Sequence, residues 1–278
     1  MSIANPMLIT SLVEYTLLRN ALLVGTLAAI LAGVVGYFLV IRRLAFAGHA
    51  LGHVGFAGAT GAGLLNLSPL TGQLFLTVIS AVGIGVLGHK TSKSDITIGI
   101  VLAFSLGLGV LFLHFYTNYA SQAMSVLFGN LLAVSVTSIK IIATCALASL
   151  IAISLIARPL LFSSLEPELA EAKGVSLAVI SLIFMLIVAL TVTITSQVVG
   201  ILLVFTLLVG PAASALNWTS QVMTGLLLTI TIGVVVVWLG ITAAFVTDWP
   251  IPFWISTLSA VTYLVSVISY RQLLKKRR

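Results

Sequence analysis

Apolar stretches long enough to cross a lipid bilayer follow one another along almost the whole chain. Of the 278 residues, 60% are hydrophobic and only 7% are charged, whereas about 25% of the residues of an ordinary soluble domain are charged. A bilayer core about 30 Å thick takes about 20 apolar residues per helical pass. The stretches lack the period-2 alternation of membrane β-barrels. Because backbone amides in lipid must bond within their own segment, the sequence predicts an all-α integral membrane protein.

The apolar segments predict a polytopic bundle of eight to nine transmembrane helices. They run over residues 15–41, 49–66, 70–88, 95–115, 136–157, 175–196, 198–216, 222–246 and 253–271. The stretch of residues 121–134 is too short to cross alone, so we expect it to lie at the interface or to re-enter the membrane. Little sequence is left for a soluble domain, and residues 1–278 are therefore expected to form a single transmembrane domain.

The formal net charge of +7 reflects cations that lie at the ends of the predicted helices. They do not form a patch interleaved with aromatic residues, which argues against nucleic acid as a partner. When the C-terminal run RQLLKKRR is placed in the cytoplasm, counting passes puts every Lys and Arg except Arg19 and Lys140 on that side. This asymmetry follows the positive-inside rule and predicts a multi-pass protein whose C-terminus is cytoplasmic.

Two of the four histidines lie in the stretch GHALGHVGFAGATG. His49, His53, Phe56 and Thr60 follow the spacing i, i+4, i+7, i+11 and share one helix face, beside a stripe of small residues. Imidazoles one turn apart approach closely enough to share one ion, and neutral imidazole suits Zn²⁺ while tolerating Mn²⁺ and Fe²⁺. Ionisable groups in a membrane usually face a polar path, so we expect a metal-binding role. The alternative is that both histidines bond a neighbouring helix.

The sequence argues against two enzymatic functions, a zinc protease and an ATPase. A zinc protease of the H-E-x-x-H type needs a glutamate as general base, but HALGH has no acid between its histidines. The stretch GIGVLGHKT resembles a phosphate-binding loop, but G-x-x-x-x-G-K-[ST] requires lysine at the position of His89. The chain is therefore not expected to be an enzyme or to hydrolyse ATP by itself.

Three of the six acidic residues lie close together in RPLLFSSLEPELAEAKGVS. Pro167 suits the first position of a helix, acids suit its first turn, and Gly174 suits its exit. We expect a short amphipathic helix over residues 166–173 on the cytoplasmic face. A solvated connector, held out of the lipid by its charges, is the alternative.

Five stretches, in order along the chain, resemble the permease subunit of the bacterial ABC transporters for zinc, manganese and ferrous iron. They are RRLAFAGHALGHVGFAG, SDITIGIVLAFSLGLGVLFL, VLFGNLLAV, SLEPELAEAKGVS and QVVGILLVFTLLVGPAASA. The resemblance implies a permease of the bacterial cytoplasmic membrane that forms the ion path as a homodimer or a pair of permeases. It also implies two further partners, a cytoplasmic P-loop ATPase and an extracytoplasmic metal-binding protein, and no permanently bound cofactor.

The resemblance also implies roles for individual residues. Residues 163–175 match the family's cytoplasmic coupling segment, through Glu166, Pro167, Glu168, Ala170 and Gly174. Gly200 and Pro211 are expected to shape a helix near the path, with ordinary helix packing as the alternative.

The chain departs from the family at the expected metal site. The family has an Asp and a His four residues apart, and here His49 takes the place of the aspartate while His53 matches the histidine. Two imidazoles favour Zn²⁺ over a hard ion such as Mn²⁺, so zinc is the expected cargo, with manganese and iron as alternatives. A self-sufficient cation channel or proton-coupled carrier is the rival function. Residue chemistry alone does not exclude export, and the family resemblance is what favours import.

Overall fold

All regular structure that the computed structural model describes is helical. The structure describes residues 16–87, 94–116, 126–129 and 136–276. The helices are α2 (Thr16–Ile41), α3 (Ala45–Leu64), α4 (Pro69–Leu87), α5 (Ser94–His114), α7 (Val136–Leu165), α8 (Pro167–Ala172), α9 (Leu177–Val199), α10 (Ile201–Trp218), α11 (Val222–Thr247) and α12 (Ile251–Lys276). The prediction of an all-helical membrane protein is confirmed.

Each of the nine predicted apolar segments coincides with a helix of at least 18 residues in the described part of the chain. Seven of these helices are long and apolar enough to cross a membrane. Helix α3 is not among the seven because histidines and small residues lower its hydropathy. The apolar stretch described in α5, Ile98–His114, is shorter. The sequence predicted eight to nine spans, so the two counts differ at α3 and α5.

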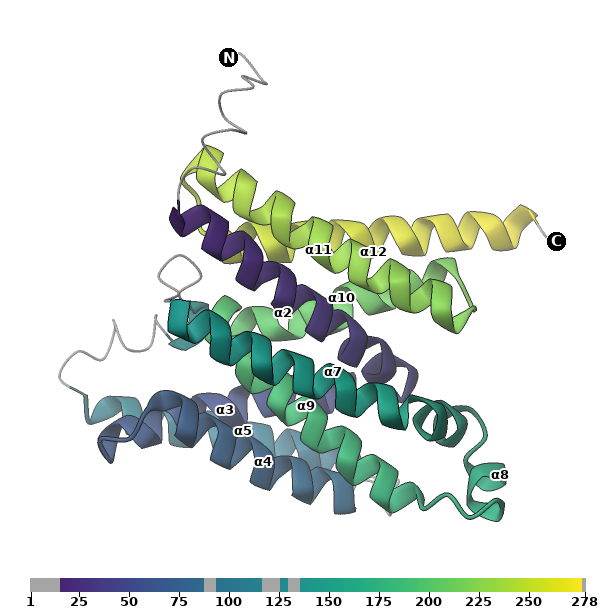
Figure 1. Ribbon diagram of the computed structural model, residues 1–278, viewed down its shortest axis with the longest axis horizontal. Helices are drawn as coiled ribbons and strands as arrows, with labels where there is room; N and C mark the ends of the chain where they lie inside the picture. Colours follow the sequence, from purple (N-terminus) through teal and green to yellow (C-terminus); the bar gives the residue numbers. More distant parts are fainter. Residues whose placement is uncertain (1–15, 88–93, 117–125, 130–135, 277–278) are drawn as a thin grey trace.

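The long helices lie alongside one another in an elongated bundle (Figure 1). Helix α2 starts at the left of this view, and its last turn lies toward the right. Helix α8 and the C-terminal end of α12 also lie at the right. The charged segment around α8 and the basic end of α12 therefore share one end of the bundle, as the charge asymmetry predicted.

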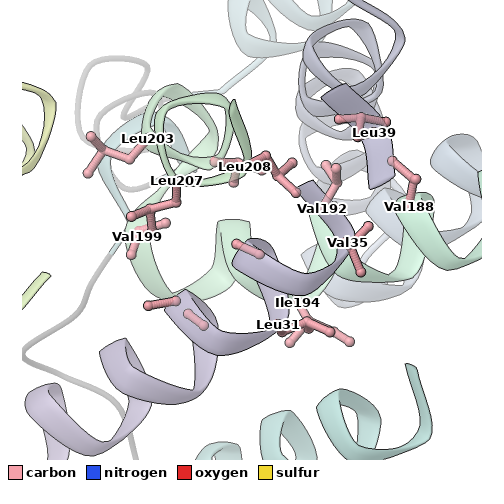
Figure 2. Close-up of a cluster of buried hydrophobic side chains, with 14 of the residues drawn as sticks. Leu31, Val35, Leu39, Val188, Val192, Ile194, Val199, Leu203, Leu207 and Leu208 are labelled. Carbon is pink, nitrogen blue, oxygen red and sulfur yellow. The ribbon is translucent and has the colours of Figure 1, made fainter. Parts of the chain in front are cut away.

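The core forms where α2, α9 and α10 meet (Figure 2). Leucine, valine and isoleucine side chains from the three helices fill this region, among them Leu31, Leu39, Val188, Val192 and Leu208. A side chain at Gly36 of α2 would overlap the carbonyl of Leu208, so the two backbones nearly touch. Close approach of small residues is the usual basis of helix packing in membranes. Lipid tails are as apolar as the helix surfaces, so the hydrophobic effect does not drive the helices together there.

A single residue, Gly200, separates α9 from α10. Its φ of 81° and ψ of 158° belong to a region that is essentially restricted to glycine. A Cβ at this position would overlap the backbone of Leu127, Phe128 and Gly129. Residues 126–129 are the part of the expected interfacial or re-entrant stretch that the structure describes, and they pack on this turn. The rest of residues 121–134 lies outside the described residues, as do His89, Lys90, Lys93 and the last two arginines.

Candidate functional site

Helix α3 presents His49 and His53 on one face, as predicted. The two ring centroids are 4.7 Å apart, and the rings are nearly perpendicular at 85°. Both side chains are partly exposed, whereas most of α3 is buried. The Nδ1 atom of His53 is buried and has no hydrogen-bond partner among the described residues. At least one nitrogen of the pair is therefore left without a hydrogen bond among the described residues.

The third side chain of the histidine site is Phe205 of α10. Its ring centroid lies 4.9 Å from that of His49, with an angle of 66° between the rings. The sequence analysis missed Phe205, because it lies 156 positions after His49 in the chain. Its only sequence signal is an aromatic ring within an otherwise aliphatic run, ILLVFTLLVG.

Close packing of small residues fixes the orientation of α3. A Cβ at Gly48 would lie 2.7 Å from Leu39 of α2, and one at Gly55 would lie 3.0 Å from Gln73 of α4. At Gly52, a Cβ would lie 3.5 Å from Ile201 of α10. This side of α3 is therefore held by three helices, and the ring of His49 lies against Phe205 of α10.

Phe56 and Thr60 share the histidine face but are closed off by neighbouring helices. Phe56 is 3% exposed and packs against Gly109 of α5. Thr60 is 2% exposed, and its Oγ1 donates to the carbonyls of Phe56 and Ala57 at 2.9 and 3.2 Å. Phe56 is buried and the hydroxyl of Thr60 is hydrogen-bonded within its own helix. The expected contact of these two side chains with the path therefore stays a prediction.

Pro211 lies inside α10 and is buried, 11 residues after the glycine turn. It lacks the amide that would bond the preceding turn, which favours a local bend. Gly200 and Pro211 thus lie at the start and in the second half of the helix that carries Phe205. Their proximity to a path stays a prediction.

A short helix lies where the acidic segment predicted one. Helix α8 begins at Pro167, and Ala170 is fully buried whereas Glu166 and Glu168 are exposed. The helix ends with a bond from the Gly174 amide to the Glu171 carbonyl at 2.9 Å, and Gly174 has a φ of 84°. Ala170 is thus the buried residue of α8, and the glutamate side chains of this segment are exposed.

The described residues contain no group of three or more His, Cys, Asp and Glu side chains that could enclose a metal ion. Tetrahedral zinc takes four ligands, so the histidine pair supplies half of such a set. An open, two-ligand arrangement suits transient contact with an ion better than permanent retention.

These features define a class of protein, a polytopic helical membrane protein with an open imidazole pair between its helices. A model of the ABC 3 transport family matches residues 14–270, and the chain belongs to that family.

Curated relatives include proteins named for two different metals. The manganese transport system membrane protein MntC of Halalkalibacterium halodurans is 32% identical over 81% of this chain and 77% of its own length. The high-affinity zinc uptake system membrane protein ZnuB of Haemophilus influenzae is 31% identical over 72% of this chain and 77% of its own.

Solved structures have the same fold. The structure of PsaBC from Streptococcus pneumoniae in complex with Fab aligns with a TM-score of 0.83 and 27% identity over 94% of both chains. An inward-facing metal-chelate type ABC transporter, described as putative, aligns with a TM-score of 0.73 at 16% identity, over 99% of this chain and 91% of its own, and supports the fold alone.

Proposed function

We propose that the chain is the membrane permease subunit of an ABC importer for divalent transition metal ions, with zinc favoured over manganese and iron. The observation that carries the proposal is the His49 and His53 pair, 4.7 Å apart, on a helix of an ABC 3 family member. Relatives named for manganese and for zinc support a metal cargo. The second imidazole, in place of the family's aspartate, favours a borderline ion.

Two chains, identical or paired, form the path in this proposal. The ion contacts His49 and His53 of one permease, and water or the second permease completes its coordination. Phe56, Thr60, Gly200 and Pro211 shape the surrounding helices. Such a loosely held ion can be released, which a transport site requires.

The energy comes from a separate P-loop ATPase that docks on α8 and the flanking residues 163–175. Its ATP-driven movement alternates the opening of the path, after an extracytoplasmic metal-binding protein has delivered the ion. The exposed glutamates of α8 and its position at the same end as the basic terminus of α12 support this assignment. All nine long helices of the described residues lie in the bacterial cytoplasmic membrane in this proposal, and the C-terminus is cytoplasmic.

Radiolabelled zinc uptake by intact cells tests the metal site. His49→Ala and His53→Ala should each lower uptake by about tenfold or more, because a site with two protein ligands loses half of them. His114→Ala is the matched control, since His114 is exposed at the end of α5. Parental uptake by both site variants at normal expression would rule out the ligand role.

Purified protein in liposomes separates this function from its rival. A self-sufficient channel or proton-coupled carrier moves zinc in the absence of any ATPase, whereas the proposed permease does not. Zinc flux through the chain alone would therefore favour the rival.

A further inference from the structure

Arg42 lies at the corner between α2 and the histidine-bearing helix α3. Its amide donates to the Phe38 carbonyl at 3.0 Å, which ends α2. The next residue, Arg43, has a φ of 58°, and the chain turns there so that α3 starts at Ala45. His49 follows within little more than one helical turn. A movement of this corner therefore acts directly on the helix that holds the imidazoles.

The guanidinium of Arg42 connects this corner with two other helices. Nη1 donates to the hydroxyl of Ser163 in the last turn of α7 at 3.2 Å, and Nη2 donates to that of Ser181 in α9 at 2.7 Å. The group also lies 5.7 Å from the ring centroid of Phe184 in α9. Burial lowers the pKa of Arg42 from its ordinary value, but arginine stays protonated in proteins. One half-buried charge after the end of α2 thus contacts α7 and α9, through serines that lie 121 and 139 positions further along the chain.

The two serines flank α8. Ser163 lies four residues before Pro167, the first residue of α8, and Ser181 lies in the second turn of the helix that follows it. A cavity of about 240 Å³ adjoins Arg42 and is lined by Pro167, Ser163 and Ser181 among others. The start of α8 and the corner before α3 therefore face the same space, which leaves room for one to move relative to the other.

The contacts of Arg42 are of a kind that can rearrange when the helices move. The contacts that the described residues give Arg42 are two neutral hydroxyls and a phenyl ring, with no carboxylate among them. Hydrogen bonds from a charged donor to a hydroxyl are strong enough to transmit a displacement, and weaker than a buried ion pair. A planar guanidinium spans two acceptors in fixed geometry, which a lysine ammonium does not.

We propose that Arg42 is a positioning residue that transmits the movement of α8 to α3, through Ser163 of α7 and Ser181 of α9. The inference rests on the proposed function, in which α8 receives the movement of an ATPase and α3 contacts the ion. It adds the connection between those two elements. Breaking the connection should leave both ends intact while separating ATP hydrolysis from ion movement.

The test measures zinc ions transported per ATP hydrolysed, with the full-length chain, its ATPase and its binding protein reconstituted in liposomes. The variants are Arg42→Gln, Arg42→Lys and the double variant Ser163→Ala with Ser181→Ala. We expect each to lower the ratio by about tenfold, because the loss of one hydrogen bond to a charged group suffices for such a change. The ATPase should still copurify, and Zn²⁺ binding to the detergent-solubilised complex should stay at the parental level.

Arg43→Gln is the matched control, since Arg43 is the exposed neighbour of Arg42, and it should keep the parental ratio. A parental ratio in the Arg42 and serine variants overturns the inference while leaving the proposed function intact. Loss of ATPase assembly or of Zn²⁺ binding in all three variants also overturns it, because Arg42 then acts only in folding. Zinc transport by the unmodified complex without ATP hydrolysis overturns the proposed function, and the inference with it.

Discussion

At the scale of single residues, the position of His49 has the largest chemical consequence. Its ring lies close to those of His53 and Phe205, with centroid distances of 4.7 and 4.9 Å. One neighbour is a second imidazole and the other is an apolar ring. A carboxylate at this position would add a negative charge and a hard oxygen ligand beside the remaining imidazole.

His49→Asp should move selectivity from zinc toward manganese. Carboxylate oxygen suits Mn²⁺, whereas a second imidazole suits borderline ions. Cells carrying the variant should show a ratio of manganese to zinc uptake raised by about tenfold, a change of 1.4 kcal/mol in relative affinity. Competition between the two radiolabelled ions measures this ratio, with His114→Asp as the control. An unchanged ratio would place selectivity outside this residue.

Gly200 is a residue at which an added methyl group should harm folding. Its φ of 81° disfavours any other residue, and a Cβ would overlap the backbone of residues 127–129. Gly200→Ala should therefore lower the free energy of unfolding by about 2 kcal/mol or more. Thermal unfolding of the protein in detergent measures the loss.

Gly83→Ala provides the comparison for Gly200→Ala. Gly83 lies within α4, where a Cβ would meet nothing within 4 Å, so alanine should leave stability unchanged or raise it slightly. Equal losses of stability at the two glycines would show that neither the φ of Gly200 nor the backbone of residues 127–129 restricts the turn between α9 and α10.

At the scale of elements, α8 is held by one buried side chain and exposes its charged ones. Ala170 is 0% exposed, while Glu168 and Glu171 are exposed beside it. Lys173 covers the Phe162 ring of α7, with Nζ 5.6 Å from the ring centroid. The element therefore has a fixed base and a free acidic surface, which suits docking of a separate protein.

Reversing the charge of this acidic surface should release the ATPase. Glu168→Lys combined with Glu171→Lys should lower copurification of the ATPase by about tenfold. A basic surface of the ATPase that attracts the two glutamates would instead be repelled by the two lysines. The permease itself should fold normally, since neither side chain is buried. Glu166→Asp is the control and should retain the ATPase. Full retention by the double variant would argue against docking on α8.

At the scale of the whole molecule, large apolar side chains cover much of the outer surface. Leu155 of α7 is 77% exposed, and Phe104 of α5 and Phe75 of α4 are 67% and 66% exposed. Water would disfavour such a surface, whereas lipid acyl chains accept it. The surface thus agrees with a bundle whose outer helices face the membrane.

Reporter fusions should place the two ends of the chain on opposite sides of the membrane. All nine long helices of the described residues cross in the proposed topology, and this odd number of passes puts the two ends on opposite sides. A fluorescent protein that folds only in the cytoplasm should report at the C-terminus, and a periplasmic phosphatase should report at the N-terminus. Phosphatase activity at the C-terminus would reverse the topology.

The sequence by itself determined the helices and the spacing of the histidines. Both depend on local properties, because hydrophobic length defines a membrane helix and a spacing of four residues places two side chains on one face. The short helix α8 could be predicted for the same reason, since its proline, acids and glycine act within a few residues. The similarity of five motifs pointed to the family whose model matches residues 14–270.

Only the tertiary structure decided what surrounds those residues. Three contacts join positions that are far apart in the chain. Phe205 lies beside His49, and Ser163 and Ser181 accept hydrogen bonds from Arg42. The backbone of residues 127–129 packs against Gly200. Phe56 and Thr60 share the histidine face, but α5 covers the first and the carbonyls of α3 satisfy the second. The helical period fixes the direction of a side chain along its own helix. Which neighbour lies in that direction depends on how the glycines let the helices pack.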